Sequence, residues 1–250
     1  MVIRYDRTML KILLTKLKEW IPSCCLLCNQ RSNSGIDLCT GCLQQLPWLN
    51  RGCEQCAQPL NSEHASTRFC GACLCTPPAY DSTLAPFSYQ DTMITLIAKL
   101  KFNKNLSVGR VLGELMARHI KTNTPSDMPS LLLPVPLHPK RLRQRGYNQA
   151  IIIAEHLSKQ LKIPLNRTLC KKIRHTATQS RVDAKHRHAN IDHAFEIASR
   201  NLPSHVAIID DVMTTGATVN ALSSALKHAG VAKISVWCCA RTCRTDQKNL

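Results

Sequence analysis

The stretch HVAIIDDVMTTGATVNAL, residues 205 to 222, decides the fold. An apolar run leads into the acids Asp210 and Asp211, which are followed by small polar residues and then by apolar residues at helical spacing. A strand, a polar loop and a helix in this order are typical of an open α/β sheet, in which ligands bind outside the carboxyl ends of the strands. We therefore expect a ligand site where this strand meets its helix.

The segment between the acids and the helix has the features of a phosphate-binding loop. A helix that starts directly after it presents unpaired N–H groups and a positive dipole end to an anion. Gly216 allows backbone angles at which successive N–H groups converge, and the threonines add hydroxyl donors. The loop lacks the lysine of a Walker A sequence and does not match the dinucleotide fingerprint. The expected monophosphate cradle, here called the phosphate loop, consists of Thr214, Thr215, Gly216, Ala217 and Thr218.

The two acids need a reason to lie beside a phosphate, which they would otherwise repel. Vicinal ribose hydroxyls donate hydrogen bonds to carboxylates, and Mg²⁺ is held by carboxylates together with substrate oxygens. A solvated surface turn is the alternative. The order of strand, acids, loop and helix favours the binding site, with Asp210 and Asp211 as its binding and candidate catalytic groups.

Other segments repeat the alternation of strand and helix. Residues 131–136 (LLLPVP) and 233–240 are short apolar runs, as expected for strands covered on both faces, whereas residues 106–120 and 147–161 have helical apolar spacing. This alternation predicts an α/β fold with a parallel sheet and helices on both of its faces.

A basic segment, residues 137–150, follows the LLLPVP run and is expected to form a loop before the next helix. Arginine binds phosphate oxygens in a bidentate manner, so these side chains suit a pyrophosphate. Contacts with a nucleic-acid backbone are the alternative, and both can hold. The cations concerned are Lys140, Arg141, Arg143 and Arg145.

Ten of the 14 cysteines lie between Cys24 and Cys75. Eight of them form four C-x₂-C pairs, and two such pairs can complete a tetrahedral zinc site. Eight ligands therefore suffice for two structural zinc ions. The spacing leaves the pairing open, and we favour combination of neighbouring pairs. The expected ligands are Cys25, Cys28, Cys39, Cys42, Cys53, Cys56, Cys70 and Cys73.

The net charge is +17, which favours polyanionic partners such as nucleic acid or phosphorylated small molecules, although a solvated basic surface is an alternative. Lysines and a glutamate interrupt the apolar positions of the first 20 residues, so we expect no secretory signal there. No later run of about 18 apolar residues predicts a membrane span. Clustered thiols that serve as metal ligands are typical of a reducing compartment, and the cytoplasm is the expected location.

Residues 210–218 closely resemble the 5-phosphoribosyl 1-pyrophosphate (PRPP) motif of type I phosphoribosyltransferases. The resemblance implies that the acids hold the ribose hydroxyls and that the phosphate loop holds the 5-phosphate. With the spaced cysteines, the chain as a whole resembles the ComF (ComFC-like) family of competence proteins, which join a zinc module to this fold. Further motifs that carry this resemblance are IAKLKF (97–102), VPLHPKRLRQRGYNQ (135–149), Thr178-Gln179, Arg187, Asn190 and Ala194-Phe195.

The family resemblance also implies a pyrophosphate side formed by Arg145, Gly146, Asn148 and Gln149, and a flexible loop over residues 171–190 that closes on the pocket. The expected organisation is an N-terminal helix (1–22), a double zinc-ribbon module (23–78) and a phosphoribosyltransferase-like α/β domain (79–250).

Three functions remain open from the sequence. The resemblance favours a PRPP-binding protein that handles incoming single-stranded DNA in the cytoplasm during natural transformation. The second is an active Mg²⁺-dependent phosphoribosyltransferase with an amine or a nucleobase as acceptor. The third is a PRPP-sensing adaptor whose zinc module docks another protein, such as a helicase of the uptake machinery.

Overall fold

The computed structural model describes residues 23–60, 67–173, 194–199 and 201–243. The chain forms two compact units: an N-terminal unit that ends at Gln45 and a sheet unit that begins at Leu46. The second group of cysteines, from Cys53 to Cys73, therefore belongs to the same unit as the sheet. The expected helix over residues 1–22 and most of the expected flexible loop lie outside the described residues, and the domain boundary near residue 78 stays a prediction.

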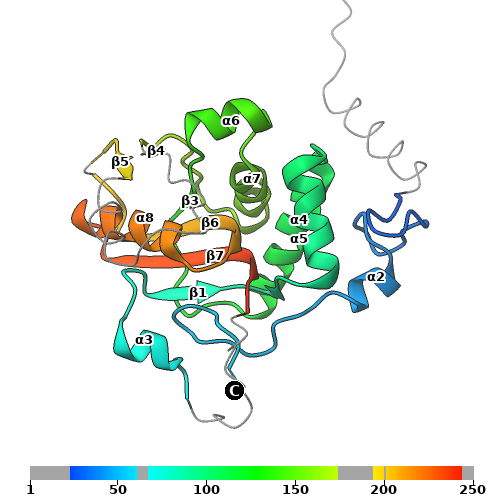
Figure 1. Cartoon of the computed structure of the whole chain (residues 1–250), viewed down its shortest axis with the longest axis horizontal. Coiled ribbons are helices and arrows are strands. Elements are labelled where there is room, and N and C mark those ends of the chain that lie inside the picture. The colour runs from blue at the N-terminus through cyan, green and yellow to red at the C-terminus, as the bar shows by residue number, and fades with distance from the viewer. Residues whose placement is uncertain (1–22, 61–66, 174–193, 200, 244–250) are drawn as a thin grey trace, which may run out of the picture. The chain divides into compact units, whose positions relative to one another are not determined.

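The sheet consists of parallel strands in the order β1-β7-β6-β3, and β2 pairs with β7 beyond the end of β1 (Figure 1). Strand β6 runs through both acids, so the strand is longer than the apolar run that predicted it, and Asp210 lies opposite Cys238 of β7. The bounds are Ser82–Leu84 for β1, Phe87–Ser88 for β2, Leu131–Pro134 for β3, His205–Met213 for β6 and Lys233–Arg241 for β7.

Five helices and a small antiparallel pair of strands surround this sheet among the described residues of the sheet unit, and a sixth short helix lies in the cysteine-rich segment. The helices are α3 (Gly71–Cys75), α4 (Asp91–Phe102), α5 (Leu106–Thr122), α6 (Pro139–Arg145), α7 (Gln149–Leu161) and α8 (Ala217–His228). The antiparallel pair consists of β4 (Cys170–Lys172) and β5 (Phe195–Ile197). The N-terminal unit contains α2 (Thr40–Gln44).

Helices cover both faces of the sheet. Val236 and Cys238 of β7 belong to one buried apolar cluster with Val219 of α8. The next residue, Cys239, contacts Met116 of α5, with 3.2 Å between the two sulfur atoms. Successive side chains of a strand point to opposite faces, so α8 and α5 pack on opposite sides of β7. The expected α/β class, a parallel sheet preceded by a cysteine-rich module, is confirmed.

The basic segment after β3 is a helix, α6, where we expected a loop. Pro139 suits the first turn of a helix because it has no N–H to leave unpaired, and the His138 side chain accepts a hydrogen bond from the Lys140 N–H at 3.2 Å. Leucine, lysine, arginine and glutamine are good helix formers and complete the two turns. Gly146 ends the helix in the left-handed conformation, with φ of 85°.

Candidate ligand-binding site and zinc centres

The acid pair lies at the carboxyl end of β6. Asp211 is only 3% exposed, whereas Asp210 is half-buried. The Asp211 N–H donates to Asp210 Oδ1 at 2.8 Å, so the two carboxyl groups share one corner of the sheet. Burial, reinforced by the neighbouring Asp211 carboxylate, raises the pKa of Asp210 well above its ordinary value. A cation close to the pair favours the ionised form of Asp210, as the nearby Lys101 does.

Lys101, at the end of α4, neutralises the buried acid. Its Nζ lies 2.6 Å from Asp211 Oδ2, and the two side chains are 23% and 4% exposed. No role was predicted for this lysine from the sequence, although it lies in the IAKLKF motif. A signal was present, because Lys101 follows the buried Ile97 by four residues and so continues the apolar face of α4. A lysine at such a position needs a buried partner.

Gln149 and Arg145 connect the acid pair to α6. Gln149 Nε2 donates to Asp211 Oδ1 at 3.4 Å, and Arg145 Nη1 donates to Gln149 Oε1 at 2.6 Å. Burial lowers the pKa of the Arg145 guanidinium, and the Asp211 carboxylate counteracts this effect. The structure thus brings the two acids together with two of the four residues that the family resemblance assigned to the pyrophosphate side.

The other two residues of that set shape the backbone. Asn148 is buried and caps α7, since its Oδ1 accepts a hydrogen bond from the Ala150 N–H at 3.0 Å and its Nδ2 donates to the Val135 carbonyl at 2.9 Å. Gly146 provides the left-handed turn between α6 and α7. The Tyr147 hydroxyl donates to the Leu100 carbonyl, which holds this turn against the end of α4 next to Lys101.

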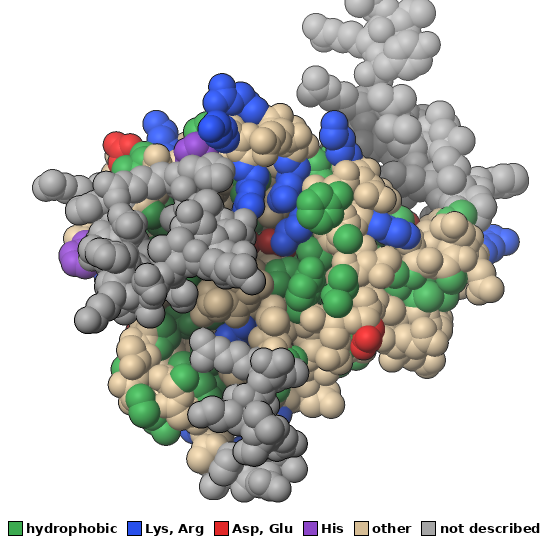
Figure 2. Space-filling model, viewed as in Figure 1, with side chains coloured by type: hydrophobic (Ala, Val, Ile, Leu, Met, Phe, Trp, Pro, Cys, Tyr) green, Lys and Arg blue, Asp and Glu red, His purple; other side chains and the backbone are tan. Residues whose placement is uncertain are grey.

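Further cations face the acids. Lys172, the last residue of β4, lies with its Nζ 5.6 Å from the centre of the Phe195 ring. Burial and the nearby Arg141 lower the pKa of Lys172, whereas Asp210 raises it, so both charges are within electrostatic reach of its ammonium group. Figure 2 shows lysine and arginine side chains gathered over α6 and beside it. The exposed cations of α6 are Lys140, Arg141 and Arg143.

The phosphate loop begins α8 in the expected way. Gly216 takes a φ of 82° and precedes the first helical residue, and the Ala217 N–H donates to Thr215 Oγ1 at 3.3 Å. Gly216 is buried, whereas the side chains of Thr214, Thr215 and Thr218 are exposed. A Cβ atom at Gly216 would lie 2.8 Å from Met213 Cε and 3.3 Å from the Tyr80 hydroxyl. Glycine is therefore required here both for its φ and for space.

A cavity of about 850 Å³ adjoins the loop. The described residues that line it include Thr215, Gly216 and Ala217 on one side and Cys56 and Cys70 on the other, but not the acid pair. The cavity joins the phosphate loop to the second group of cysteines within the sheet unit.

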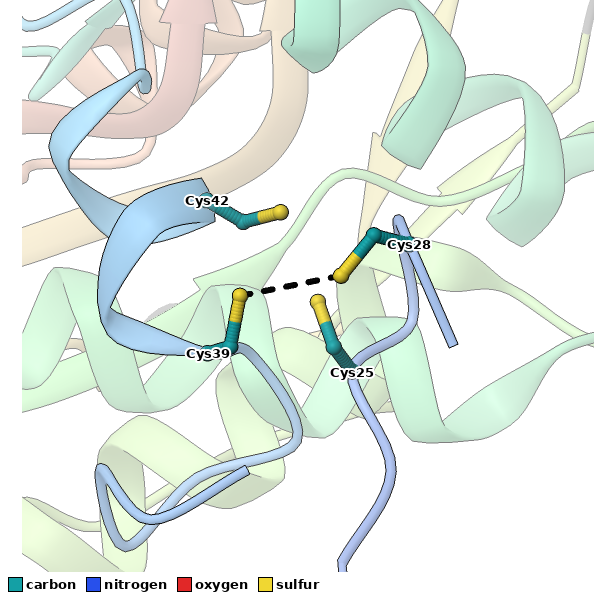
Figure 3. A group of neighbouring side chains, drawn as sticks. All are labelled: Cys25, Cys28, Cys39 and Cys42. Atoms are coloured by element: carbon teal, nitrogen blue, oxygen red, sulfur yellow. Dashed lines mark hydrogen bonds between the residues drawn. The ribbon is translucent and has the colours of Figure 1, made fainter. Parts of the chain in front are cut away.

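The eight expected ligands form two groups of four, each made from neighbouring pairs, as we favoured from the sequence. Within each group the sulfur atoms lie within 4.8 Å of one another. In the N-terminal unit the four thiols point toward a common centre, with Cys42 contributed by α2, and Cys28 and Cys39 have their sulfur atoms 3.6 Å apart (Figure 3). The Cys56 and Cys70 sulfur atoms are also 3.6 Å apart. A tetrahedral zinc ion with Zn–S bonds of about 2.3 Å separates its sulfurs by about 3.8 Å, so both groups fit zinc.

The two groups are built by the same turn. The Asn29 N–H donates to the Cys25 carbonyl at 2.9 Å, and the Ala57 N–H donates in the same way to the Cys53 carbonyl at 2.7 Å. Asn29 and Ala57 both have a positive φ, of 61° and 54°. This equivalence makes the cysteine-rich segment a structural repeat, which the spacing of the pairs alone only suggested.

Local hydrogen bonds prepare one of these thiols for a metal. Burial raises the pKa of Cys25, but backbone N–H groups of Cys28, Cys39 and Leu27 outweigh this effect and lower it to about 6. The thiolate is the form that binds zinc, so Cys25 favours its ligand state at neutral pH, whereas burial raises the pKa of Cys42 to about 12.

Comparison with known proteins agrees with this architecture. Residues 17–74 match the model of the double zinc ribbon domain. The chain is 36% identical to competence protein F of Haemophilus influenzae over 82% of this chain and 90% of that protein. The chain belongs to the competence protein F (ComF) family. The DNA utilization protein YhgH of Escherichia coli O157:H7 is 30% identical over 89% of this chain and 98% of that protein. The competence protein ComFC of Streptococcus pneumoniae is 24% identical over 87% of this chain and 99% of that protein.

Among solved structures, a purine phosphoribosyltransferase from Pyrococcus horikoshii aligns with this ComF-family chain at a TM-score of 0.30 and 17% identity, covering 52% of this chain and 80% of that one. In the described part of the chain, every helix is too short or too polar to span a bilayer.

Proposed function

We propose that this ComF-family protein binds PRPP between the acid pair and the phosphate loop. The observation that carries the proposal is the position of both acids at the carboxyl end of β6, directly before a glycine-initiated helix, with cations on the facing elements α4, α6 and β4. PRPP has two vicinal hydroxyls between a phosphate and a pyrophosphate. The protein site offers the two carboxyl groups as hydrogen-bond acceptors between the donors of the phosphate loop and the cations of α4, α6 and β4.

Each group of the site has a distinct task in this proposal. The carboxylates of Asp210 and Asp211 accept the ribose hydroxyls, and the N–H groups and threonine hydroxyls of the phosphate loop donate to the 5-phosphate. Lys101 forms an ion pair with Asp211, and Arg145 and Lys172 balance the pyrophosphate. Asp210, which has no ion pair with Lys101, would also be the carboxylate available to Mg²⁺, and the ion would neutralise charge on the pyrophosphate.

Zinc has a structural task. Four thiolates in each group would hold one ion, which cross-links two turns of a segment that has few large apolar side chains. In the second group this cross-link also supports the sheet unit, because Cys53, Cys56 and Cys73 are part of its buried core.

The test is calorimetry of PRPP binding with Mg²⁺. Changing Asp210→Asn and Asp211→Asn together is expected to weaken binding by at least about tenfold, since a hydrogen bond to a charged acceptor contributes about 1.5–3 kcal/mol. The matched control is Asp91→Asn, an exposed acid at the start of α4 with φ of 45°, which asparagine tolerates. Equal affinity of the double variant and the parent would refute the assignment of the site.

A second candidate function, handling of single-stranded DNA in the cytoplasm during natural transformation, is supported by α6. This helix exposes Lys140, Arg141 and Arg143 on one short segment, and relatives carry the names competence protein and DNA utilization protein. Phosphate contacts of this kind are independent of base sequence, so the helix suits a strand of any sequence.

The variant Arg141→Gln/Arg143→Gln/Arg145→Gln is expected to bind single-stranded DNA more weakly. If all three arginines contact phosphates, the slope of log affinity against log salt becomes shallower by about 2, since each contact contributes about 0.7. Fluorescence anisotropy of a labelled oligonucleotide at several salt concentrations measures both quantities. The variant Lys121→Gln/Lys159→Gln, with exposed lysines of α5 and α7, is the control. An unchanged slope in the arginine variant would remove α6 from the DNA surface.

A further inference from the structure

Arg241, the last residue of β7, is buried at 3% exposure and ties three segments of the sheet unit together. Its Nε donates to the Cys56 carbonyl at 2.8 Å, and its Nη1 donates to the Met213 and Thr242 carbonyls at 3.0 Å each. Nη1 also donates to the Thr214 carbonyl. All four acceptors are backbone carbonyls, so the guanidinium acts on the course of the chain.

Two of these bonds orient the phosphate loop. In a trans peptide the C=O and the following N–H point in opposite directions. When Arg241 holds the Met213 and Thr214 carbonyls, the N–H groups of Thr214 and Thr215 are turned away from the arginine. Such fixed donors are what a loop needs if it is to receive a phosphate without rearranging.

The remaining contact reaches the second group of cysteines. Cys56 is one of its four thiols, and Arg241 holds the carbonyl of that same residue. Two further hydrogen bonds connect the same regions through residues 79 and 80. Gln55 Nε2 donates to the Tyr80 carbonyl at 3.3 Å, and the Ala79 N–H donates to Asn220 Oδ1, in the first turn of α8, at 2.7 Å. The second cysteine group and the phosphate loop are therefore parts of one hydrogen-bonded frame.

We propose that Arg241 is a positioning residue that couples zinc binding at Cys53, Cys56, Cys70 and Cys73 to phosphate binding at the phosphate loop. The inference rests on the proposed function, because it assigns a regulator to the same loop. A metal that fixes the Cys56 turn fixes one anchor of Arg241, and the arginine in turn fixes the loop carbonyls. Coupling is reciprocal, so a ligand on the loop must raise the affinity of this zinc site by the factor by which zinc raises the affinity for the ligand.

The experiment compares zinc affinity with and without ribose 5-phosphate, using competition against a chromophoric chelator. A Cys39→Ser/Cys42→Ser background disables the first site, so that only the second zinc is titrated. Saturating ribose 5-phosphate is expected to tighten the second site by at least about fivefold, the lower end of common coupling factors. Calorimetry of ribose 5-phosphate binding to the zinc-loaded and zinc-depleted chain must give the same factor.

Arg241→Lys tests the residue, because lysine keeps the charge but cannot reach several carbonyls with a planar fork. The variant is expected to lose the ligand effect on zinc affinity, while Arg118→Lys, at an exposed arginine of α5, retains it. If Arg241→Lys does not fold, the titrations of the parent chain still decide whether zinc binding and ligand binding are coupled. Ligand binding without any change in zinc affinity would overturn the coupling alone, and failure of the zinc-loaded chain to bind ribose 5-phosphate or PRPP would overturn the proposed function and the coupling with it.

Discussion

Replacing Gly216 by valine is expected to lower the free energy of unfolding by about 3 kcal/mol and to weaken binding of ribose 5-phosphate by about a hundredfold. A left-handed φ costs an ordinary residue about 1–2 kcal/mol, and more when it is β-branched. The new Cβ would also lie 2.8 Å from Met213 Cε, so the end of this buried side chain has to shift. Relief of the left-handed strain at residue 216 displaces the loop N–H groups, which removes several hydrogen bonds to the phosphate at once. Urea denaturation and calorimetry measure the two effects.

Gly146→Val is the matched control for the backbone. Gly146 has nearly the same φ, 85°, but a Cβ atom there has no neighbour within 4 Å. Gly146→Val should therefore lose only the free energy that the left-handed conformation costs a valine. Its loss of stability should be smaller than that of Gly216→Val, which also brings Cβ against Met213. If Gly216→Val binds ribose 5-phosphate as the parent does, the loop is not the phosphate site.

Lys101→Met is expected to destabilise the protein by about 3 kcal/mol, at the lower end of the range for breaking a buried ion pair because the lysine is 23% exposed. The change leaves the Asp211 carboxylate, 4% exposed, with the Gln149 amide at 3.4 Å as its remaining side-chain donor among the described residues. Methionine keeps most of the length and apolar contact of the lysine stem, so the loss reports the charge. Urea denaturation of the variant and the parent gives the value.

A double-mutant cycle separates the pair from its surroundings. Asp211→Asn removes the charge that Lys101→Met leaves behind, so the double variant should recover part of the loss, with a coupling energy of about 2 kcal/mol. Lys159→Met, at an exposed lysine of α7, should change stability by less than about 0.5 kcal/mol. Additive effects of the two single changes would show that Lys101 and Asp211 do not stabilise one another.

The acid pair illustrates what local sequence can predict. The strand, acids, loop and helix of residues 205–222 are contiguous, so each is positioned by the one before it, and the left-handed Gly216 is required by the turn itself. The cysteine pairs were predictable for the same reason, since a C-x₂-C turn sets the position of two thiols within four residues, whereas the combination of neighbouring pairs into groups of four came from the structure. Helix α6 was missed because its basic side chains form no apolar face, although Pro139 and Gly146 mark its ends.

By itself the sequence determined the parallel α/β class, the strand-to-helix corner with its two acids, and the C-x₂-C pairs that supply the metal ligands, because these depend on residues close together in the chain. Only the tertiary structure decided that Lys101 pairs with Asp211 and that Arg241 joins Cys56 to the phosphate loop. These partners come from different elements that the sheet and its helices bring into contact. A lysine or an arginine in an apolar segment signals that a partner is needed, but packing selects which one.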